Sequence, residues 1–262
     1  MMRALITAGT GMVAQQTNLD VIANNLANVN TTAFKQQRAE FHDMMYQSLR
    51  PSGAEGAGGS KAPVAIQVGL GVRFAGNATN FGQGGLNATG NQYEMAISGE
   101  GFFGVDMPDG RVGYTRDGSF KLDADGSMVT TDGNRLRPAI TVPANATSFT
   151  VSANGNVTVQ IAGEDTPRSL GTIQLTLFPN PSGMTRIGQN TYLGGGASGE
   201  AVVTDAGLQG AGNIQGGFIE SSNVSIVEEM VRMITAQRAY EVNSKAIQTA
   251  DDMLGILNQL KR

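Results

Sequence analysis

The sequence predicts an α+β fold: long N- and C-terminal helices forming a coiled-coil-like core, with a central antiparallel β-rich domain between them in the chain. Apolar residues recur every seven positions at both ends of the 262-residue chain, which is the spacing of helices that pack along a seam. In the middle, Asp-Gly pairs follow one another about eight residues apart, as in a series of β-hairpins. No segment of helical periodicity interrupts that region, so we expect its strands to be antiparallel.

We expect residues 1–35 to form the first long helix. Its two seam positions repeat every seven residues, with one polar exception. They are Leu5, Met12, Leu19 and Leu26 in one seam and Ala8, Gln15, Ile22 and Val29 in the other. Asparagine side chains compete for backbone hydrogen bonds, so the helix should weaken toward its end, at Asn24, Asn25, Asn28 and Asn30.

The region 36–68 is predicted to be an extended linker. It contains the Gly-rich stretch 50–61, which has too few apolar residues to pack and is expected to be exposed or locally disordered. The β-rich outer domain is expected over 69–205, and 206–224 should return to the last helix in extended form. The Asp-Gly turns of the β-rich domain are predicted at 109–110, 117–118, 125–126 and 132–133.

The last helix is predicted over 225–262. Ser225 and Glu228 have the spacing of a capping box in front of an apolar run. One seam is apolar, and we expect Met230 to add to its face. That seam consists of Met233, Tyr240, Ile247 and Leu254, whereas the other is polar, with Gln237, Ser244 and Asp251. The predicted apolar stripe is therefore narrow.

The composition excludes several classes of protein. Without cysteine, thiol catalysis and cysteine-based metal sites are impossible. His42 is the single histidine, and no motif of a nucleophilic enzyme is present. A net charge of −4 argues against a nucleic-acid partner. We therefore predict no catalytic residue, no cofactor, no metal and no small-molecule substrate. The polar N-terminus also lacks the apolar core of a cleavable signal peptide.

The two end helices suggest self-association. If they pair with each other, we expect further apolar surface to stay uncovered, and other copies of the chain would be its natural cover. The small residues expected on this surface are Ala8, Ala14, Ala236 and Ala250. A heterologous contact of this kind repeats into a helical polymer unless it closes into a ring.

Three blocks of sequence resemble the bacterial flagellar rod and hook proteins, the axial protein family. The first block is NNLANVNTTAFK at 24–35, the second spans 99–120 and includes YTRDGSF, and the third begins with ESSNV at 220–224 and continues through QRAYEVNSK at 237–245. The family usually has glycine where this chain has Ala33. The signature residues are Asn25, Leu26, Ala27, Asn28, Thr31, Phe34, Lys35, Ser222, Asn223, Val224, Gln237 and Arg238.

The chain length, the 239–245 segment and the insertion that includes 46–61 resemble the distal-rod members of that family. The resemblance implies a structural subunit of the basal body in the periplasm, which polymerises into the hollow drive shaft that carries motor torque to the hook. It also implies contacts with proximal rod proteins, the hook protein, the P-ring and L-ring proteins and the flagellar type III export apparatus. The alternatives are another axial protein, from the proximal rod or hook, or a soluble β-domain binding module dimerised by its helices.

From the apolar stripes, we predict that the terminal helices supply a polymerisation core. Its side chains would pack against one another within a subunit or between neighbouring subunits. They are Leu5, Met12, Leu19, Ile22, Leu26, Val29, Met230, Met233, Tyr240, Ile247 and Leu254.

Overall fold

The computed structural model describes residues 2–50, 64–163 and 166–260, so most of the Gly-rich stretch expected to be exposed lies outside the described residues. The chain forms two compact units. The terminal unit consists of residues 1–27, 37–78 and 225–262, and the central unit consists of residues 28–36 and 79–224. Helices at both ends and antiparallel strands between them confirm the predicted α+β class.

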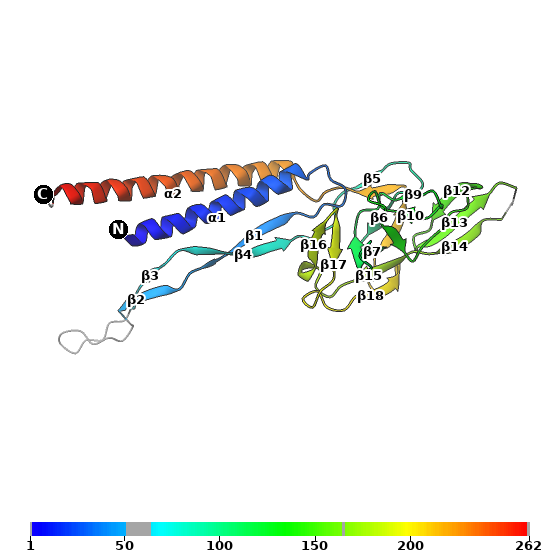
Figure 1. Ribbon diagram of the computed structural model, residues 1–262, viewed down its shortest axis with the longest axis horizontal. Helices are drawn as coiled ribbons and strands as arrows, with labels where there is room; N and C mark the ends of the chain where they lie inside the picture. Colours follow the sequence, from blue (N-terminus) through cyan, green and yellow to red (C-terminus); the bar gives the residue numbers. More distant parts are fainter. Residues whose placement is uncertain (1, 51–63, 164–165, 261–262) are drawn as a thin grey trace. The chain divides into compact units, whose positions relative to one another are not determined.

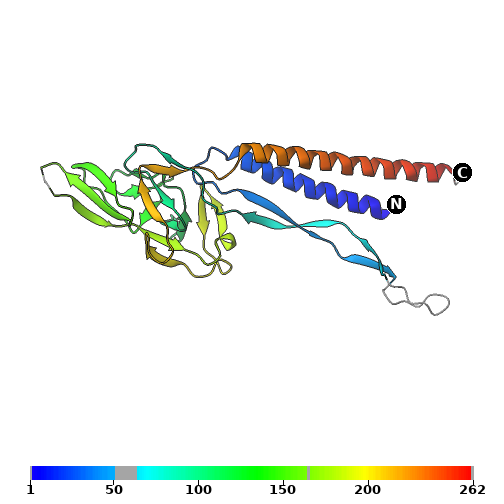
Figure 2. The ribbon, with the colours of Figure 1, turned by 180° about the vertical axis from the view of Figure 1, so that it is seen from behind.

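Two long helices, α1 (Met2–Ala27) and α2 (Ile226–Leu260), lie side by side in the terminal unit, as both views show (Figure 1, Figure 2). Helix α1 ends before the run of asparagines and threonines is complete, and the amide of Thr31 donates to the carbonyl of Asn28 at 3.1 Å in the turn that follows. Helix α2 begins directly after Ser225, whose carbonyl accepts a hydrogen bond from the amide of Glu229 at 3.0 Å. With 35 residues, α2 is about 52 Å long.

The contact face of α2 is built on small and polar residues as well as the predicted apolar seam. Met233, Ile247 and Leu254 are half-buried, as expected of a seam. The second seam, however, differs from the predicted one, because Gln237 and Asp251 are exposed and Ser244 is only half-buried. It consists of Glu229, Ala236, Asn243 and Ala250. The correction follows from the helical phase, because residues 229, 236, 243 and 250 lie beside the apolar seam on the same side of the helix.

The alanines therefore do not form the uncovered surface. Ala14, Ala236 and Ala250 are buried, and Ala8 is half-buried. Small side chains let the two helices approach closely. A Cβ added to Gly11 of α1 would lie 3.0 Å from Nδ2 of Asn243 in α2. The side chains left uncovered are larger ones on the opposite faces of the helices.

The segment expected to be a plain linker forms paired strands. In the terminal unit β1 (Gln37–Asp43) pairs with β4 (Val72–Thr79), and β2 (Tyr46–Arg50) pairs with β3 (Ile66–Gly69). Helix α1 packs against β1, and the amide of Val72 in β4 donates to Oγ1 of Thr10 in α1 at 3.3 Å. The rings of Phe41 and Phe74 meet edge to face across the ladder, with centroids 6.0 Å apart.

The central unit contains the remaining described strands and one 3₁₀ turn, η1 (Pro181–Gly183). The strands are β5 (Leu86–Ala88), β6 (Met95–Ser98), β7 (Phe102–Asp106), β8 (Val112–Thr115), β9 (Lys121–Leu122), β10 (Met128–Val129), β11 (Arg135–Arg137), β12 (Ala146–Val151), β13 (Asn156–Ile161), β14 (Arg168–Thr172), β15 (Gln174–Leu177), β16 (Thr185–Gly188), β17 (Thr191–Leu193), β18 (Val202–Asp205), β19 (Asn213–Gly216) and β20 (Phe218–Glu220).

Strand β7 organises this unit. The main sheet has the order β16-β17-β8-β7-β11-β10-β9, and β15 pairs with both β7 and β18. Strands β12, β13 and β14 form a second sheet, while β6 pairs with β19 and β5 pairs with β20. The core beneath the sheets includes Phe103 of β7, Ile97, Leu136 and Leu175, all at 0% exposure.

The Asp-Gly pairs at 109–110, 125–126 and 132–133 form the predicted turns, whereas 117–118 lies in irregular chain and forms no turn. The amide of Gly126 donates to the carbonyl of Asp123 at 2.9 Å, and the amide of Gly133 donates to the carbonyl of Thr130 at 3.0 Å. Both glycines have positive φ, at 74° and 85°, a backbone conformation that glycine adopts without the clash of a Cβ. The hairpin interpretation is therefore confirmed for these three turns and wrong for 117–118, because β8 and β9 on either side of it do not pair with each other.

Gly118 is required by close packing within the core of the central unit. Its carbonyl accepts from the amide of Met95 at 3.0 Å, and an added Cβ would collide with the carbonyl oxygen of Met95. We expect Gly118→Ala to lower the free energy of unfolding by about 1–3 kcal/mol, measured by urea denaturation. Gly85→Ala is the matched control, because a Cβ there meets nothing within 4 Å. Equal stability of the two variants would contradict the packing argument.

Candidate functional site

The three sequence blocks converge on one buried ionic cluster in the central unit. Lys35 comes from the first block, Arg116 from the second and Glu220 from the third. Nζ of Lys35 lies 2.6 Å from Oε1 of Glu220, and Nη1 of Arg116 lies 3.5 Å from Oε2 of the same carboxylate. The side chains of Lys35 and Glu220 are 0% exposed and that of Arg116 is 4% exposed. We call this group the ionic junction.

Backbone groups complete the solvation that burial removes. Nζ of Lys35 also donates to the carbonyl of Gly82 at 2.9 Å, and the amide of Gly84 donates to Oε1 of Glu220 at 2.8 Å. A buried charge is tolerated only when it is paired and hydrogen-bonded. A side chain at position 84 would remove this arrangement, because its Cβ would collide with the carbonyl of Ser221.

Arg116 is held by the glycine-rich run that precedes β7. Its Nη2 donates to the carbonyl of Gly99 at 2.7 Å, and its Nε donates to the carbonyl of Gly101 at 3.0 Å. Both glycines have positive φ, at 116° and 131°, which turns their carbonyls toward the guanidinium. The guanidinium also lies 5.5 Å from the ring centroid of Phe102. The junction has two cations and one carboxylate, and these carbonyls stabilise the second cation.

Burial lowers the proton affinity of Lys35. Desolvation lowers the pKa of Lys35 below its ordinary value of 10.5, and this effect exceeds the opposing attraction of the Glu220 carboxylate. The nearby charge of Arg116 also lowers the pKa. Removal of the carboxylate would leave two buried cations with carbonyl partners alone, so the integrity of the junction depends on Glu220.

The main chain around the junction is pinned as well. The amide of Ala33 donates to the carbonyl of Glu220 at 2.8 Å. Ala33 is 2% exposed and has a φ of 54°, the left-handed region in which glycine is usual. Glycine, the residue that the family resemblance implies at this position, would adopt this φ without strain.

Asn223 is a second anchor. Its Oδ1 accepts from the amide of Gln36 at 2.7 Å, and its Nδ2 donates to the carbonyls of Asn80 and Gly82, each at 2.9 Å. One signature side chain thus joins three segments of the central unit that are far apart in sequence.

A separate polar network lies within the terminal unit. Nδ2 of Asn25 in α1 donates to the carbonyl of Gln37 at 2.8 Å, and the amide of Gln37 donates back to Oδ1 at 2.9 Å. The same Nδ2 contacts Oε2 of Glu229 in α2 at 3.1 Å. Glu229 is fully buried and pairs with Arg232 at 3.2 Å. Asn25 therefore links α1, β1 and α2.

The residues predicted for the polymerisation core differ in exposure. Ile22 is buried, Met230 is 51% exposed and Tyr240 is 39% exposed. Val29 belongs to the central unit, where it is half-buried. The other members are half-buried in α1 and α2; they are Leu5, Met12, Leu19, Leu26, Met233, Ile247 and Leu254.

The signature residues also have different surroundings. Phe34 is buried, with the guanidinium of Arg186 5.3 Å from its ring centroid. Oγ1 of Thr31 donates to Oδ1 of Asn28 at 3.1 Å, and Oγ of Ser222 accepts from the amide of Val224 at 3.3 Å. Ala27, Gln237 and Arg238 are exposed, whereas Leu26 is half-buried.

Sequence reasoning missed the residues that complete both networks. Arg116 and Glu220 stood in the recognised blocks but were not singled out as site residues. Glu229 lies in the first turn of α2, and no sequence pattern indicated that it is buried. No pattern pointed to Arg186, whose Nη2 donates to the carbonyl of Lys35 at 2.6 Å.

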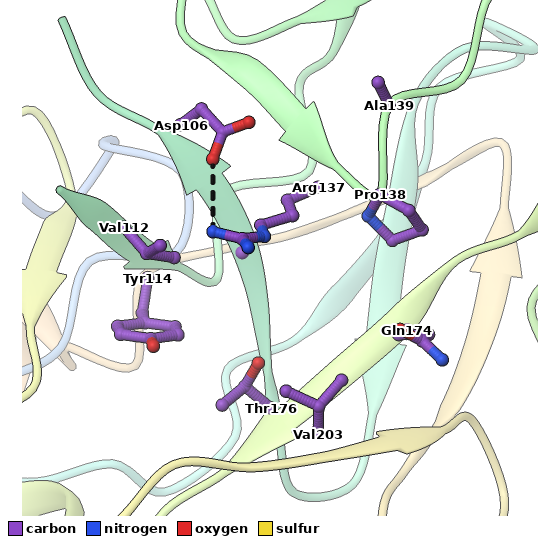
Figure 3. Close-up of a pocket in the computed structure, with 10 residues that line it drawn as sticks. Asp106, Val112, Tyr114, Arg137, Pro138, Ala139, Gln174, Thr176 and Val203 are labelled. Atoms are coloured by element: carbon purple, nitrogen blue, oxygen red, sulfur yellow. Dashed lines mark ion pairs between the residues drawn. The ribbon is translucent and has the colours of Figure 1, made fainter. Parts of the chain in front are cut away.

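A cleft of about 730 Å³ lies elsewhere in the central unit (Figure 3). Tyr114, Gln174, Thr176 and Val203 line it, and Arg137 pairs with Asp106 at 3.5 Å. Its lining residues include no histidine and no arrangement of nucleophile and base. Within the part of the chain that the structure describes, no group of three or more histidine, aspartate or glutamate side chains could hold a metal ion. No described helix is long and apolar enough to cross a membrane.

Three family models match the parts of the chain that contain the three blocks. Residues 5–35 match the family described as flagella basal body rod protein. Residues 96–159 match the flagellar hook protein FlgE/F/G D1 domain. Residues 215–260 match the flagellar basal body rod FlgEFG protein C-terminal family.

Several whole proteins are similar over their full length, and each is named flagellar basal-body rod protein FlgG. The one from Borreliella burgdorferi is 47% identical over 264 residues, which cover 100% of both chains. The one from Caulobacter vibrioides is 43% identical, with 99% of this chain and 100% of the relative covered. The one from Bacillus subtilis is 39% identical, with 100% of both covered.

We expect Glu220→Gln to lower the free energy of unfolding by about 3–5 kcal/mol, because it leaves Lys35 and Arg116 buried without a carboxylate. Urea denaturation of the full chain measures the loss. The control is Asp106→Asn, which removes an ion pair whose side chains are 54% and 58% exposed and should cost less than about 1 kcal/mol. Similar losses in the two variants would mean that the junction does not stabilise the fold.

Substitutions at Ala33 should separate backbone strain from packing. Ala33→Val places a β-branched residue at positive φ, so we expect a loss of about 1–3 kcal/mol in the free energy of unfolding. Ala33→Gly should change it by less than about 1 kcal/mol, because relief of strain offsets the loss of a buried methyl group. Thermal and urea denaturation give both values. A valine variant as stable as the glycine variant would refute the strain argument.

Proposed function

This chain belongs to the flagellar basal-body rod protein family, and on that premise we propose that it is the structural subunit of the distal rod. In this role it self-assembles into the hollow helical drive shaft of the basal body, which crosses the periplasm and transmits motor torque to the hook. The full-length similarity to relatives named rod protein favours the rod over the hook. The chain acts as a building block and has no catalytic task.

The observation that carries this proposal is the uncovered apolar face of α2. Val227, Val231, Ile234 and Val242 are 73%, 57%, 50% and 65% exposed. At 100° per residue they lie on the side of the helix opposite its buried residues. Exposed apolar side chains that share one face of a helix are typical of an interaction site.

Helix α1 has a matching feature. Ile6 and Val13, seven residues apart, are 59% and 65% exposed. Helices α1 and α2 thus have apolar residues both where they contact each other and on their exposed faces. This suits a polymer in which the exposed faces of one subunit are covered by the helices of neighbouring subunits. The coiled-coil-like core proposed for the rod would combine the half-buried seams of α1 and α2 within a subunit with these outer faces between subunits.

The ionic junction supports a role in torque transmission. It fixes the segments around Lys35, Gly82 and Glu220 inside the central unit, at positions close in sequence to where the chain passes to the terminal unit. In a subunit that transmits torque, the segments at which the chain leaves the central unit must resist local unfolding. A paired buried cluster resists opening, because exposure of one charged group leaves the others buried without their partner.

The partners follow from the proposed place in the basal body. Proximal rod proteins lie below, the hook protein lies above, and the P-ring and L-ring proteins surround the rod. The flagellar type III export apparatus delivers the subunit. A proximal-rod position is the main alternative, and a dimeric binding module is disfavoured by the rod family membership.

Charge on the outer face of α2 should prevent assembly. We expect Ile234→Asp to abolish rods in cells that carry it in place of the wild-type chain, because an aspartate cannot be buried between subunits without a partner. Electron microscopy of extracted basal bodies and swimming in soft agar measure the effect. Circular dichroism of the purified chain should be unchanged.

Leu208→Asp is the matched control. Leu208 is 58% exposed in the central unit, outside the proposed helical core, so this variant should form rods. Normal rods with Ile234→Asp would overturn the assignment of the α2 face to assembly.

A further inference from the structure

An apolar groove of about 420 Å³ lies within the terminal unit, between α1 and β4. Its walls include Ile6 and Val13 of α1 and Val72 and Phe74 of β4. Ile6, Val13 and Phe74 are 59%, 65% and 42% exposed, so no described part of the same chain fills the groove. Arg73 lies at its edge and is exposed.

The floor of the groove includes a glycine that no described contact within the chain explains. Gly9 lies in the interior of α1, where glycine is destabilising relative to alanine. A Cβ at Gly9 would meet nothing within 4 Å, whereas a Cβ at Gly11 would lie 3.0 Å from Asn243. Gly11 is thus explained by packing inside the subunit, and Gly9 leaves bare backbone open to an approaching side chain.

A second unexplained glycine lies near the end of α2. A Cβ at Gly255 would also meet nothing within 4 Å. Asp252, three residues before Gly255 and four before Ile256, lies near both on the helix surface. Ile256 is 57% exposed and Asp252 is exposed. This face of α2 therefore offers an apolar side chain, a small residue and a negative charge together.

We propose that the groove of one subunit receives the Asp252–Ile256 face of α2 from a second copy of the chain, with Arg73 opposite Asp252. The inference rests on the proposed rod function and specifies which surfaces meet. Charge complementarity selects the occupant. Arg73 and Asp252 are both exposed, and neither makes an ion pair with any residue in the described ranges.

The two surfaces are different parts of one chain, so the contact is heterologous. Every subunit then offers a free groove at one side and a free α2 face at the other, and the contact repeats into a filament. Ile256 would fill the space between Ile6, Val13 and Phe74, while the two glycines allow the helices to approach closely.

Charge reversal and its exchange test the pairing. In cells that carry only the variant chain, Arg73→Asp or Asp252→Arg should each reduce the number of complete rods at least about tenfold. The chain with both substitutions should restore rods to near the wild-type number, since the pair is re-formed with reversed sign. Electron microscopy of extracted basal bodies gives the count.

The control combines Arg38→Asp with Asp252→Arg. Arg38 is an exposed arginine of β1 outside this groove, so this combination should not restore rods. Rescue by both combinations would indicate only a net-charge effect, and absence of rescue by Arg73→Asp would overturn the proposed pairing. If instead the wild-type chain is absent from purified rods, the proposed function itself fails.

A substitution that leaves every charge unchanged gives a second test of the contact. Gly9→Leu fills the groove from within, and the space around Gly9 keeps the variant compatible with the folded terminal unit. We expect unchanged circular dichroism of the purified chain and loss of rods. A normal rod count with Gly9→Leu would contradict the groove as a contact between subunits, including contact with any occupant other than α2.

Discussion

The buried contact between Lys35 and Glu220 is the interaction on which the central unit depends. It joins residues 185 positions apart in the chain, and each of its charges would be costly to bury alone. Arg116 and the carbonyls of Gly82, Gly99 and Gly101 complete the cluster. The three sequence blocks thus meet at one buried cluster, in which the Glu220 carboxylate from the third block pairs with a cation from each of the other two.

The two units differ in how they bury their apolar side chains. The central unit closes its apolar core within itself, around fully buried side chains such as Phe103 and Leu175. The terminal unit aligns two helices through small residues and a polar link at Asn25, and leaves large apolar side chains exposed on the outer faces. A closed unit needs no partner for stability, whereas the open one has surface to offer a neighbouring copy. This division suits a subunit that polymerises through its chain ends.

Much of the fold could be predicted from local patterns. Heptad spacing located both helices, the capping box marked the start of α2, and the Asp-Gly pairs at 109–110, 125–126 and 132–133 marked turns. The second seam of α2 could not be predicted, because Glu229, Ala236 and Asn243 show no apolar periodicity and are selected by the close approach of α1. The pairing of β1 with β4 and the burial of Glu220 likewise depend on segments far apart in sequence. The positive φ of Ala33 could not be predicted from the residue type, because alanine rarely adopts this conformation.

Electron microscopy of basal bodies from cells that lack this gene tests the central claim most directly. The account predicts a rod that starts at its base and stops short, without a hook or outer rings, and regains full length when the gene is returned. Loss of the rod from its base would place the chain in the proximal rod instead. Intact basal bodies and normal swimming would contradict the assignment to the rod.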